Sequence, residues 1–300
     1  MASLATQLDD LREVQTNLAW AWWTEMGVPG AVRTEIATTL HPEALVVFTA
    51  PLAEQDARLR GHAISWLLAH GRLLGARQVL AVANQLPAIP SVMGDFMATL
   101  KAAGGPSWAG YSVGTPIPGV YPPSDRRLPI ERPSLAVLRL RAAFGLHARA
   151  EVLTVLAGEG ARPMTHAELA PHIASTPRNV RLALDDLVLA GVVDTQNHSG
   201  TRRYRCVDAS ALREWVGPIP RMPAWPAILP ALTALSCALR SGTGDVERSV
   251  RALRLLERHR EALALIDYAP LPTSEGRSFA EELTAWLLGA SSSLLPAVQQ

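Results

Sequence analysis

Apolar residues recur every three or four positions over much of the chain, which is the pattern of a helix with one buried face. The clearest stripe lies between Ser3 and Glu25, with Gln15 as its single break. It consists of Leu4, Leu8, Leu11, Leu18 and Trp22. The same spacing predicts helices over 58–70, 76–85 and 91–101. Short connections favour an antiparallel bundle, and the first stripe packs either on this bundle or on a second copy of the chain.

Two segments rich in proline and glycine interrupt the helical pattern. Residues 104–133 contain seven Pro and five Gly, and residues 217–230 contain five Pro. The first segment cannot form a regular helix, because proline lacks the amide donor and clashes with the preceding turn. Both contain aromatic side chains, which indicates ordered extended chain packed on its neighbours. The predicted division is a helical N-terminal domain over 1–103, a connecting segment over 104–133, a central domain over 134–216 and a helical C-terminal region over 217–300.

The C-terminal region carries two more apolar stripes. Leu229, Leu232, Leu235 and Leu239 predict one buried helix face. Val246, Val250, Leu253, Leu256 and Leu263 predict a second. The arginines interspersed in this second segment indicate a solvated face of mixed charge.

The central domain has the most specific pattern of local signals. One long helix is predicted over 135–157. Thr165 and Glu168 have the spacing of a capping box, so a short helix begins there. Thr176 followed by Pro177 begins a second helix over 176–190, which ends before a glycine. Two strands separated by the turn sequence NHSG then predict a β-hairpin over 192–207.

The order helix, helix, turn, helix and hairpin resembles the winged helix-turn-helix domain of MarR- and ArsR-like transcription regulators. The resemblance rests on THAELA for the positioning helix, TPRNVRLALDDLVLAGVV for the recognition helix and RRYRC at the end of the wing. It covers about a quarter of the chain. It implies a mainly α fold with a central winged helix between helical regions, and a DNA-binding transcription regulator. A homodimer in the cytoplasm is also expected.

In this type of domain, the leading turns of the second helix enter the major groove of double-stranded DNA. Arginine can bond guanine and asparagine can bond adenine through paired hydrogen bonds, whereas basic residues of the wing meet phosphates or the minor groove. His198 at the wing tip can add a phosphate contact when it is protonated. The predicted DNA-binding residues are Thr176, Arg178, Asn179, Arg181, His198, Arg202, Arg203 and Arg205.

The charge of the chain limits how strongly one copy could bind DNA. The whole chain has a net charge of +1. Residues 134–217 contain ten basic and eight acidic side chains, a difference of +2. Because affinity for the DNA backbone grows with the number of phosphates neutralised, two protomers on two half-sites are expected. The alternative is that the winged helix serves as a protein-interaction module, such as an antitoxin or an assembly subunit, without specific DNA binding.

Other chemistry has little support. Gly110 to Gly114 matches the GxSxG pattern of a hydrolase nucleophile, but no strand precedes it and no helix follows it. Histidine spacing does not support a metal site, and no nucleotide-binding motif implies a cofactor. Cys206 and Cys237 are isolated from each other in sequence, which argues against a disulfide framework. The chain is therefore not expected to be an enzyme.

Two further features bear on ligands and location. The tryptophans Trp20, Trp22 and Trp23, with Trp66 and Trp108, can either fill the core or line a pocket for a small-molecule effector, which the sequence does not identify. No stretch of about 18 uncharged apolar residues is present, so no membrane segment is expected.

Overall fold

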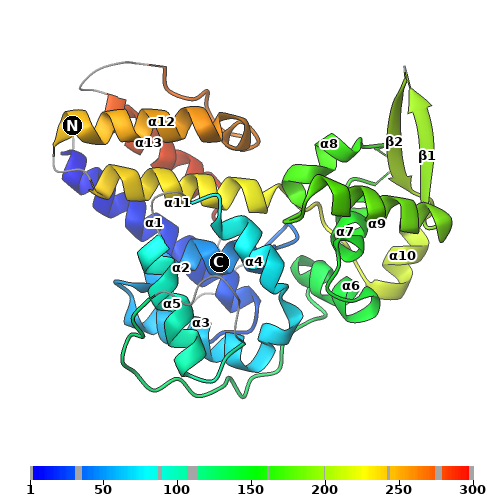
Figure 1. The fold of residues 1–300 in the computed structure, drawn as a ribbon, viewed down its shortest axis with the longest axis horizontal. Coiled ribbons are helices and arrows are strands. Elements are labelled where there is room, and N and C mark those ends of the chain that lie inside the picture. Colours follow the sequence, from blue (N-terminus) through cyan, green and yellow to red (C-terminus); the bar gives the residue numbers. More distant parts are fainter. Residues whose placement is uncertain are drawn as a thin grey trace.

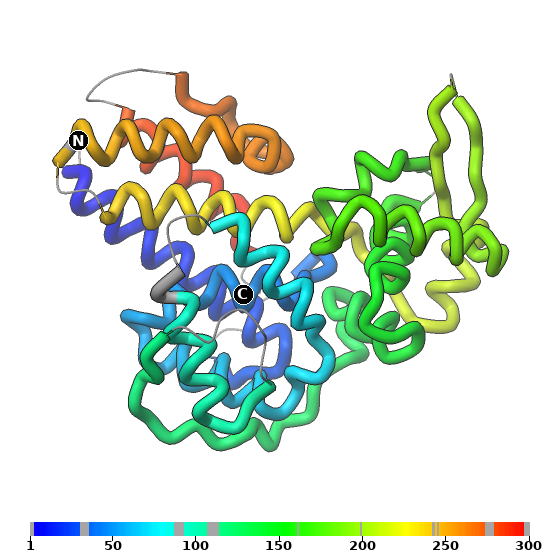
Figure 2. The backbone as a smooth tube through the Cα atoms, in the orientation of Figure 1, coloured from blue at the N-terminus to red at the C-terminus, as the bar shows by residue number. Residues whose placement is uncertain are grey.

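A computed structural model describes residues 3–30, 36–86, 90–106, 114–160, 162–198, 200–241, 244–273 and 279–296 (Figures 1 and 2). The described chain is mainly helical, with one antiparallel pair of strands. The first helices are α1 (Leu4–Glu25), α2 (Pro42–Ala53), α3 (Ala57–His70), α4 (Ala76–Ala83) and α5 (Pro90–Ala102). The central elements are α6 (Ala136–Phe144), α7 (Ala148–Gly158), α8 (His166–Leu169), α9 (Pro177–Leu189), β1 (Val193–His198), β2 (Thr201–Cys206) and α10 (Ala209–Val216). The last are α11 (Trp225–Ser241), α12 (Asp245–Leu263) and α13 (Phe279–Ser293), and 3-10 turns occupy Gly71–Leu73, Pro133–Leu135 and Ala170–His172.

The helices at the two ends of the chain pack into one body, here called the helical body. α13 lies along α1, and α11 packs against α2 and α12 (Figure 1). The elements from α6 to α10 form a second unit beside it, here called the hairpin unit. The chain therefore leaves the helical body after α5 and returns to it at α11, so its first and last helices share a core.

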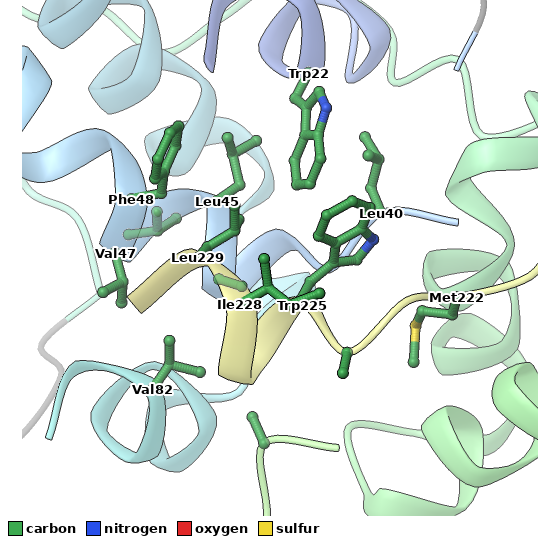
Figure 3. Close-up of a cluster of buried hydrophobic side chains, with 14 of the residues drawn as sticks. Trp22, Leu40, Leu45, Val47, Phe48, Val82, Met222, Trp225, Ile228 and Leu229 are labelled. Atoms are coloured by element: carbon green, nitrogen blue, oxygen red, sulfur yellow. The ribbon is translucent and has the colours of Figure 1, made fainter. Parts of the chain in front are cut away.

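Tryptophans fill much of the core of the helical body. The rings of Trp22 and Trp225 meet edge to face at 4.6 Å between centroids, which brings α1 against α11 (Figure 3). Trp23 and Trp66 meet in the same way at 5.5 Å. Their indole nitrogens donate to Thr49 Oγ1 and to the Met26 carbonyl, both at 2.9 Å. Burying a tryptophan requires such a partner for its N–H, so these side chains are packed as core residues. Trp108 lies outside the described residues.

Gln15, the break in the first apolar stripe, is buried with its neighbours. Its amide donates to Ser236 Oγ on α11 at 2.8 Å. The stripe on α1 is therefore covered by the C-terminal helices of its own chain.

The connecting segment is ordered and extended where it is described. The Ile117 amide donates to Thr99 Oγ1 on α5, and the Ser124 amide donates to the Ser65 carbonyl on α3. Leu128 is buried. Residues 110–113 of the GxSxG match lie outside the described residues.

Two predictions about the helices differ from the structure, and one helix was not predicted. The long helix over 135–157 is two helices, because Gly145 adopts φ +82° and ends α6. α2 was not predicted, because it is buried on nearly all sides and so lacks a helical period. Val246, Val250 and Leu253 are exposed, because α12 packs through the face that carries Leu256 and Leu263. No described helix is long and apolar enough to cross a membrane.

Candidate nucleic-acid interface

The short helix α8 and the longer α9 are each started by the side chain that the sequence predicts. Thr165 Oγ1 accepts from the Glu168 amide at 3.1 Å, and Glu168 accepts from the Thr165 amide at 2.7 Å. Thr176 Oγ1 accepts from the Asn179 amide at 3.3 Å, and proline is the first residue of α9. These caps satisfy amides that a helix leaves without partners, so both starts are encoded locally.

The hairpin follows α9 after a glycine with φ +71°, Gly191. β1 and β2 pair from Val193 with Cys206 to His198 with Thr201. Tyr204 also exchanges two backbone hydrogen bonds with Met164, at 2.7 and 2.8 Å, just before α8. The hairpin is therefore anchored at its base to α8, while its tip extends away from the molecule (Figure 1).

One face of α9 is buried and the other is open to solvent. Val180, Ala183, Leu184 and Leu187 pack into the hairpin unit. Thr176, Arg178, Asn179 and Arg181 are all exposed. Within the described residues, neither Arg178 nor Arg181 has an acidic partner. The first two turns of α9 thus present two guanidinium groups that are available to an external anion.

The predicted arginines of the wing are placed differently, because each pairs with a carboxylate of its own chain. Arg202 lies 3.4 Å from Asp185 on α9, and its guanidinium lies 5.2 Å from the Tyr204 ring centroid. Arg203 lies 3.4 Å from Glu168 and donates to the Pro163 carbonyl at 3.1 Å. Arg205 lies 3.1 Å from Asp194 across the hairpin. His198 is exposed at the end of β1.

Two of these carboxylates, Glu168 and Asp194, have lowered pKa values. The backbone hydrogen bond from Thr165, together with Arg203 and Arg162, holds the pKa of Glu168 below its ordinary value. The hydrogen bond from Arg205 lowers the pKa of Asp194. All three arginine pairs are partly exposed, and such pairs contribute only about 0–1 kcal/mol, so a phosphate could replace the carboxylate at little cost.

Two leucines on the open face of α9 were not predicted to be exposed. Leu182 is 53% exposed and Leu189 is 89% exposed. They lie near Arg178 and Asp185 on the helical surface, since α-helical residues three, four or seven apart share one face. The open face therefore combines two cations, carboxylates and apolar side chains.

A groove borders the leading end of α9. It has a volume of about 770 Å³ and separates α4 of the helical body from α7 and α9. Thr176, Asn179 and Asp186 line the α9 side. Arg149, on α7, lies 3.7 Å from Asp186 and so links α7 to α9.

A buried network of charges lies behind this groove, and the sequence analysis did not identify it. Arg141 of α6 bonds both Glu43 oxygens of α2, at 2.8 and 3.0 Å, and Glu151 of α7 at 2.6 Å. Gln78 of α4 also donates to Glu151. His41 lies 3.3 Å from Glu43. The side chains of the two glutamates, the arginine and His41 are fully buried, so this network joins the helical body to the hairpin unit.

Several side chains of this network have pKa values that differ from their ordinary values. Burial raises the Glu43 pKa, but Arg141, His41 and the hydrogen bonds to Glu43 outweigh burial, so the pKa lies below its ordinary value. Burial, with repulsion from Glu43, raises the pKa of Glu151. Burial lowers the pKa of His41 to about 4. His41 is therefore neutral near pH 7, and Arg141 is the cation that balances the carboxylates.

No cluster of three metal-ligating side chains occurs among the residues that the structure describes. Comparisons with protein-family models, curated proteins and solved structures found no match for this chain. The function is therefore argued from the geometry alone.

Proposed function

We propose that this chain is a DNA-binding transcription regulator in which the hairpin unit is a winged helix-turn-helix domain. The observation that carries the proposal is the leading end of α9, where Arg178 and Arg181 are exposed and have no acidic partner among the described residues. The extended hairpin stands beside the same helix (Figure 1). A helix whose first two turns carry exposed guanidinium groups, next to a protruding hairpin, suits insertion into a major groove.

In this mechanism, α9 enters the major groove with its first two turns. Arg178 and Arg181 bond base edges or nearby phosphates. Asn179, between them on the first turn of α9, contacts base edges in the DNA major groove. The wing contributes more weakly, because its arginines must exchange their carboxylates for phosphates. The proposal involves no catalytic step and no cofactor, and it places the protein in the cytoplasm, where it would reach DNA.

The charge balance supports a homodimer. Asp185, Asp186, Glu168 and Asp194 offset several of the arginines on this surface. One protomer can therefore neutralise few phosphates, and two half-sites related by a twofold axis would add their affinities.

The test is a titration of the purified chain onto random-sequence duplex DNA at about 50 and about 200 mM salt, followed by sequence selection. We expect affinity that falls steeply with salt, and an inverted repeat among the selected sequences. The variant Arg178→Ala/Arg181→Ala should lose about 1–3 kcal/mol per base contact on the selected site. The matched control Arg254→Ala/Arg258→Ala removes two exposed arginines from α12 and should bind as the parent does. Absence of binding at low salt, or an equal loss in the control, would refute the proposal.

A second function is favoured by the exposed leucines of α9. Leu182 and Leu189 are apolar side chains on the face that would meet DNA. Such a surface suits a protein partner better than a nucleic acid. If the parent chain fails to bind DNA, Leu182→Ser/Leu189→Ser is the variant with which to test docking of a protein on α9.

A further inference from the structure

We infer that the groove between the helical body and the hairpin unit binds a small organic anion, with a carboxylate or phosphate group on an apolar body. Its volume of about 770 Å³ lies within the usual range for small-molecule sites. It is lined by three elements that meet only in the folded chain, with α4 on one side and α7 and α9 on the other.

The first turns of all three helices line this groove. Gly75 precedes α4, His147 precedes α7 and Thr176 precedes α9. Neither Gly75 nor His147 caps its helix with a side chain. The first amides of α4 and α7 therefore have no side-chain cap, and converging helix N-termini favour an anion because their N–H groups and dipoles point toward it.

The charged side chains of the lining match that preference. Arg77 and Arg149 contribute two guanidinium groups, and Asp186 is the acidic residue of the described lining. Because Asp186 already pairs with Arg149 across 3.7 Å, a ligand anion has to compete with one exposed carboxylate.

An unsatisfied polar side chain belongs to the wall of the groove. Gln78 lines it and is 7% exposed. Its Oε1 has no hydrogen-bond donor, while its amide nitrogen bonds Glu151. This oxygen lies so close to Gly75 that a side chain at position 75 would collide with it. Buried polar atoms are usually paired, but this oxygen is shielded from solvent, so a ligand with a hydroxyl or amino donor would reach it only if the Gln78 side chain turned into the groove.

The remaining lining is apolar. Leu74 of the helical body, Leu146 before α7 and Leu182 of α9 form these walls. They would contact the body of the ligand, and burying Leu182 against it would remove part of the exposed surface described above. The exposure of Leu182 is thus explained by a bound ligand, without a second protein.

Binding in this groove would also regulate DNA binding, an extension that rests on the proposed function. Thr176 and Asn179 belong both to the groove and to the leading end of α9. A bound anion would place negative charge beside the DNA phosphates and draw Arg149 away from Asp186. Since coupling between two sites is reciprocal, DNA should weaken anion binding as much as the anion weakens DNA binding.

The experiment begins without DNA. Phenyl phosphate and mandelate are titrated calorimetrically into the full chain, with benzyl alcohol as an uncharged probe of similar size. We expect one of the anions to bind and benzyl alcohol not to bind. A preference for phenyl phosphate would identify a phosphate site, and a preference for mandelate would identify a carboxylate site.

Two variants locate the binding. Arg77→Ala/Arg149→Ala should weaken it by about tenfold or more, because hydrogen bonds to charged groups are lost. Ala81→Leu narrows the groove without changing its charge and should also weaken binding. Arg254→Ala/Arg258→Ala is the control and should bind as the parent does. Binding of neither anion, or equal binding in all variants, would overturn the assignment.

DNA affinity is then measured with and without the anion that binds. A loss of about tenfold at saturation is expected for coupling of ordinary size. Unchanged DNA affinity would overturn the regulatory part of the inference. A chain that binds the anion but no DNA would retain the groove site and refute the proposed function, so the two failures are distinguishable.

Discussion

Arg141 is the residue whose loss should most damage the junction between the helical body and the hairpin unit. It donates to Glu43 at 2.8 and 3.0 Å, to Glu151 at 2.6 Å and to the Leu73 carbonyl at 3.2 Å. Glu43 also accepts from the Gly75 amide at 2.8 Å. Arg141→Met removes the cation and keeps most of the side-chain length, so it leaves two carboxylates buried near each other.

The magnitude follows from that arrangement. Removing one partner of a buried ion pair costs about 3–5 kcal/mol, and Arg141 closes two pairs at once, so the upper part of that range is expected. Whole domains are stable by about 5–15 kcal/mol, so the variant should lose a third or more of its stability. Glu151→Gln is the matched control. Glu151 accepts its described hydrogen bonds through Oε1, which an amide oxygen can replace. The amide nitrogen would take the place of Oε2, which is buried without a partner, so this control should cost about 1–3 kcal/mol, less than Arg141→Met.

Urea unfolding of parent, variant and control at about pH 7.5 and about pH 5.5 measures these costs. Without Arg141, the buried carboxylates should have pKa values above those of the unfolded chain. The folded variant then binds more protons than the unfolded chain, so its stability falls as pH rises through the folded pKa. Its deficit relative to the parent should therefore be smaller at the lower pH. A cost below about 1 kcal/mol, or a deficit that does not change with pH, would refute this account of the network.

Two further predictions concern His41 and Gly145. Burial lowers the His41 pKa to about 4, so the unfolded chain binds the extra proton between about pH 6.5 and 4 and stability falls on acidification. His41→Asn keeps an N-cap for α2 but removes this titration. When the pH falls from about 7.5 to about 5, the free energy of unfolding of the variant, measured in urea, should therefore decrease by about 2 kcal/mol less than that of the parent. Equal decreases would contradict the lowered pKa of His41. Gly145 has φ +82° and ψ 174°, a region that other residues rarely adopt. Gly145→Ala should cost about 1–3 kcal/mol in thermal or urea unfolding. The control is Gly61→Ala, which lies within α3 and has open space where the new methyl group would be. It should leave stability unchanged or raise it. A similar loss of stability in Gly145→Ala and Gly61→Ala would contradict a role for backbone strain.

Sequence patterns predicted most of the candidate interface because its starts and turns are local. Thr165 with Glu168, and Thr176 with Pro177, determine where α8 and α9 begin through contacts within three residues. The same patterns could not show that Arg203 would contact Glu168, because those residues are far apart in the chain and meet only when the hairpin folds onto α8. α2 was missed for a related reason: it is buried on all sides, and full burial removes the alternation that identifies a helix.

By itself, the sequence determined the type and the limits of most elements, because apolar spacing, caps and turns act over a few residues. It also determined that Arg178 and Arg181 lie on the open face of α9, since the apolar positions of that helix define its buried side. Only the tertiary structure decided which helices share a core, which arginines are already paired and where a groove forms. Those features depend on contacts between distant segments, such as α1 with α13 and Arg141 with Glu43, and no local spacing encodes them.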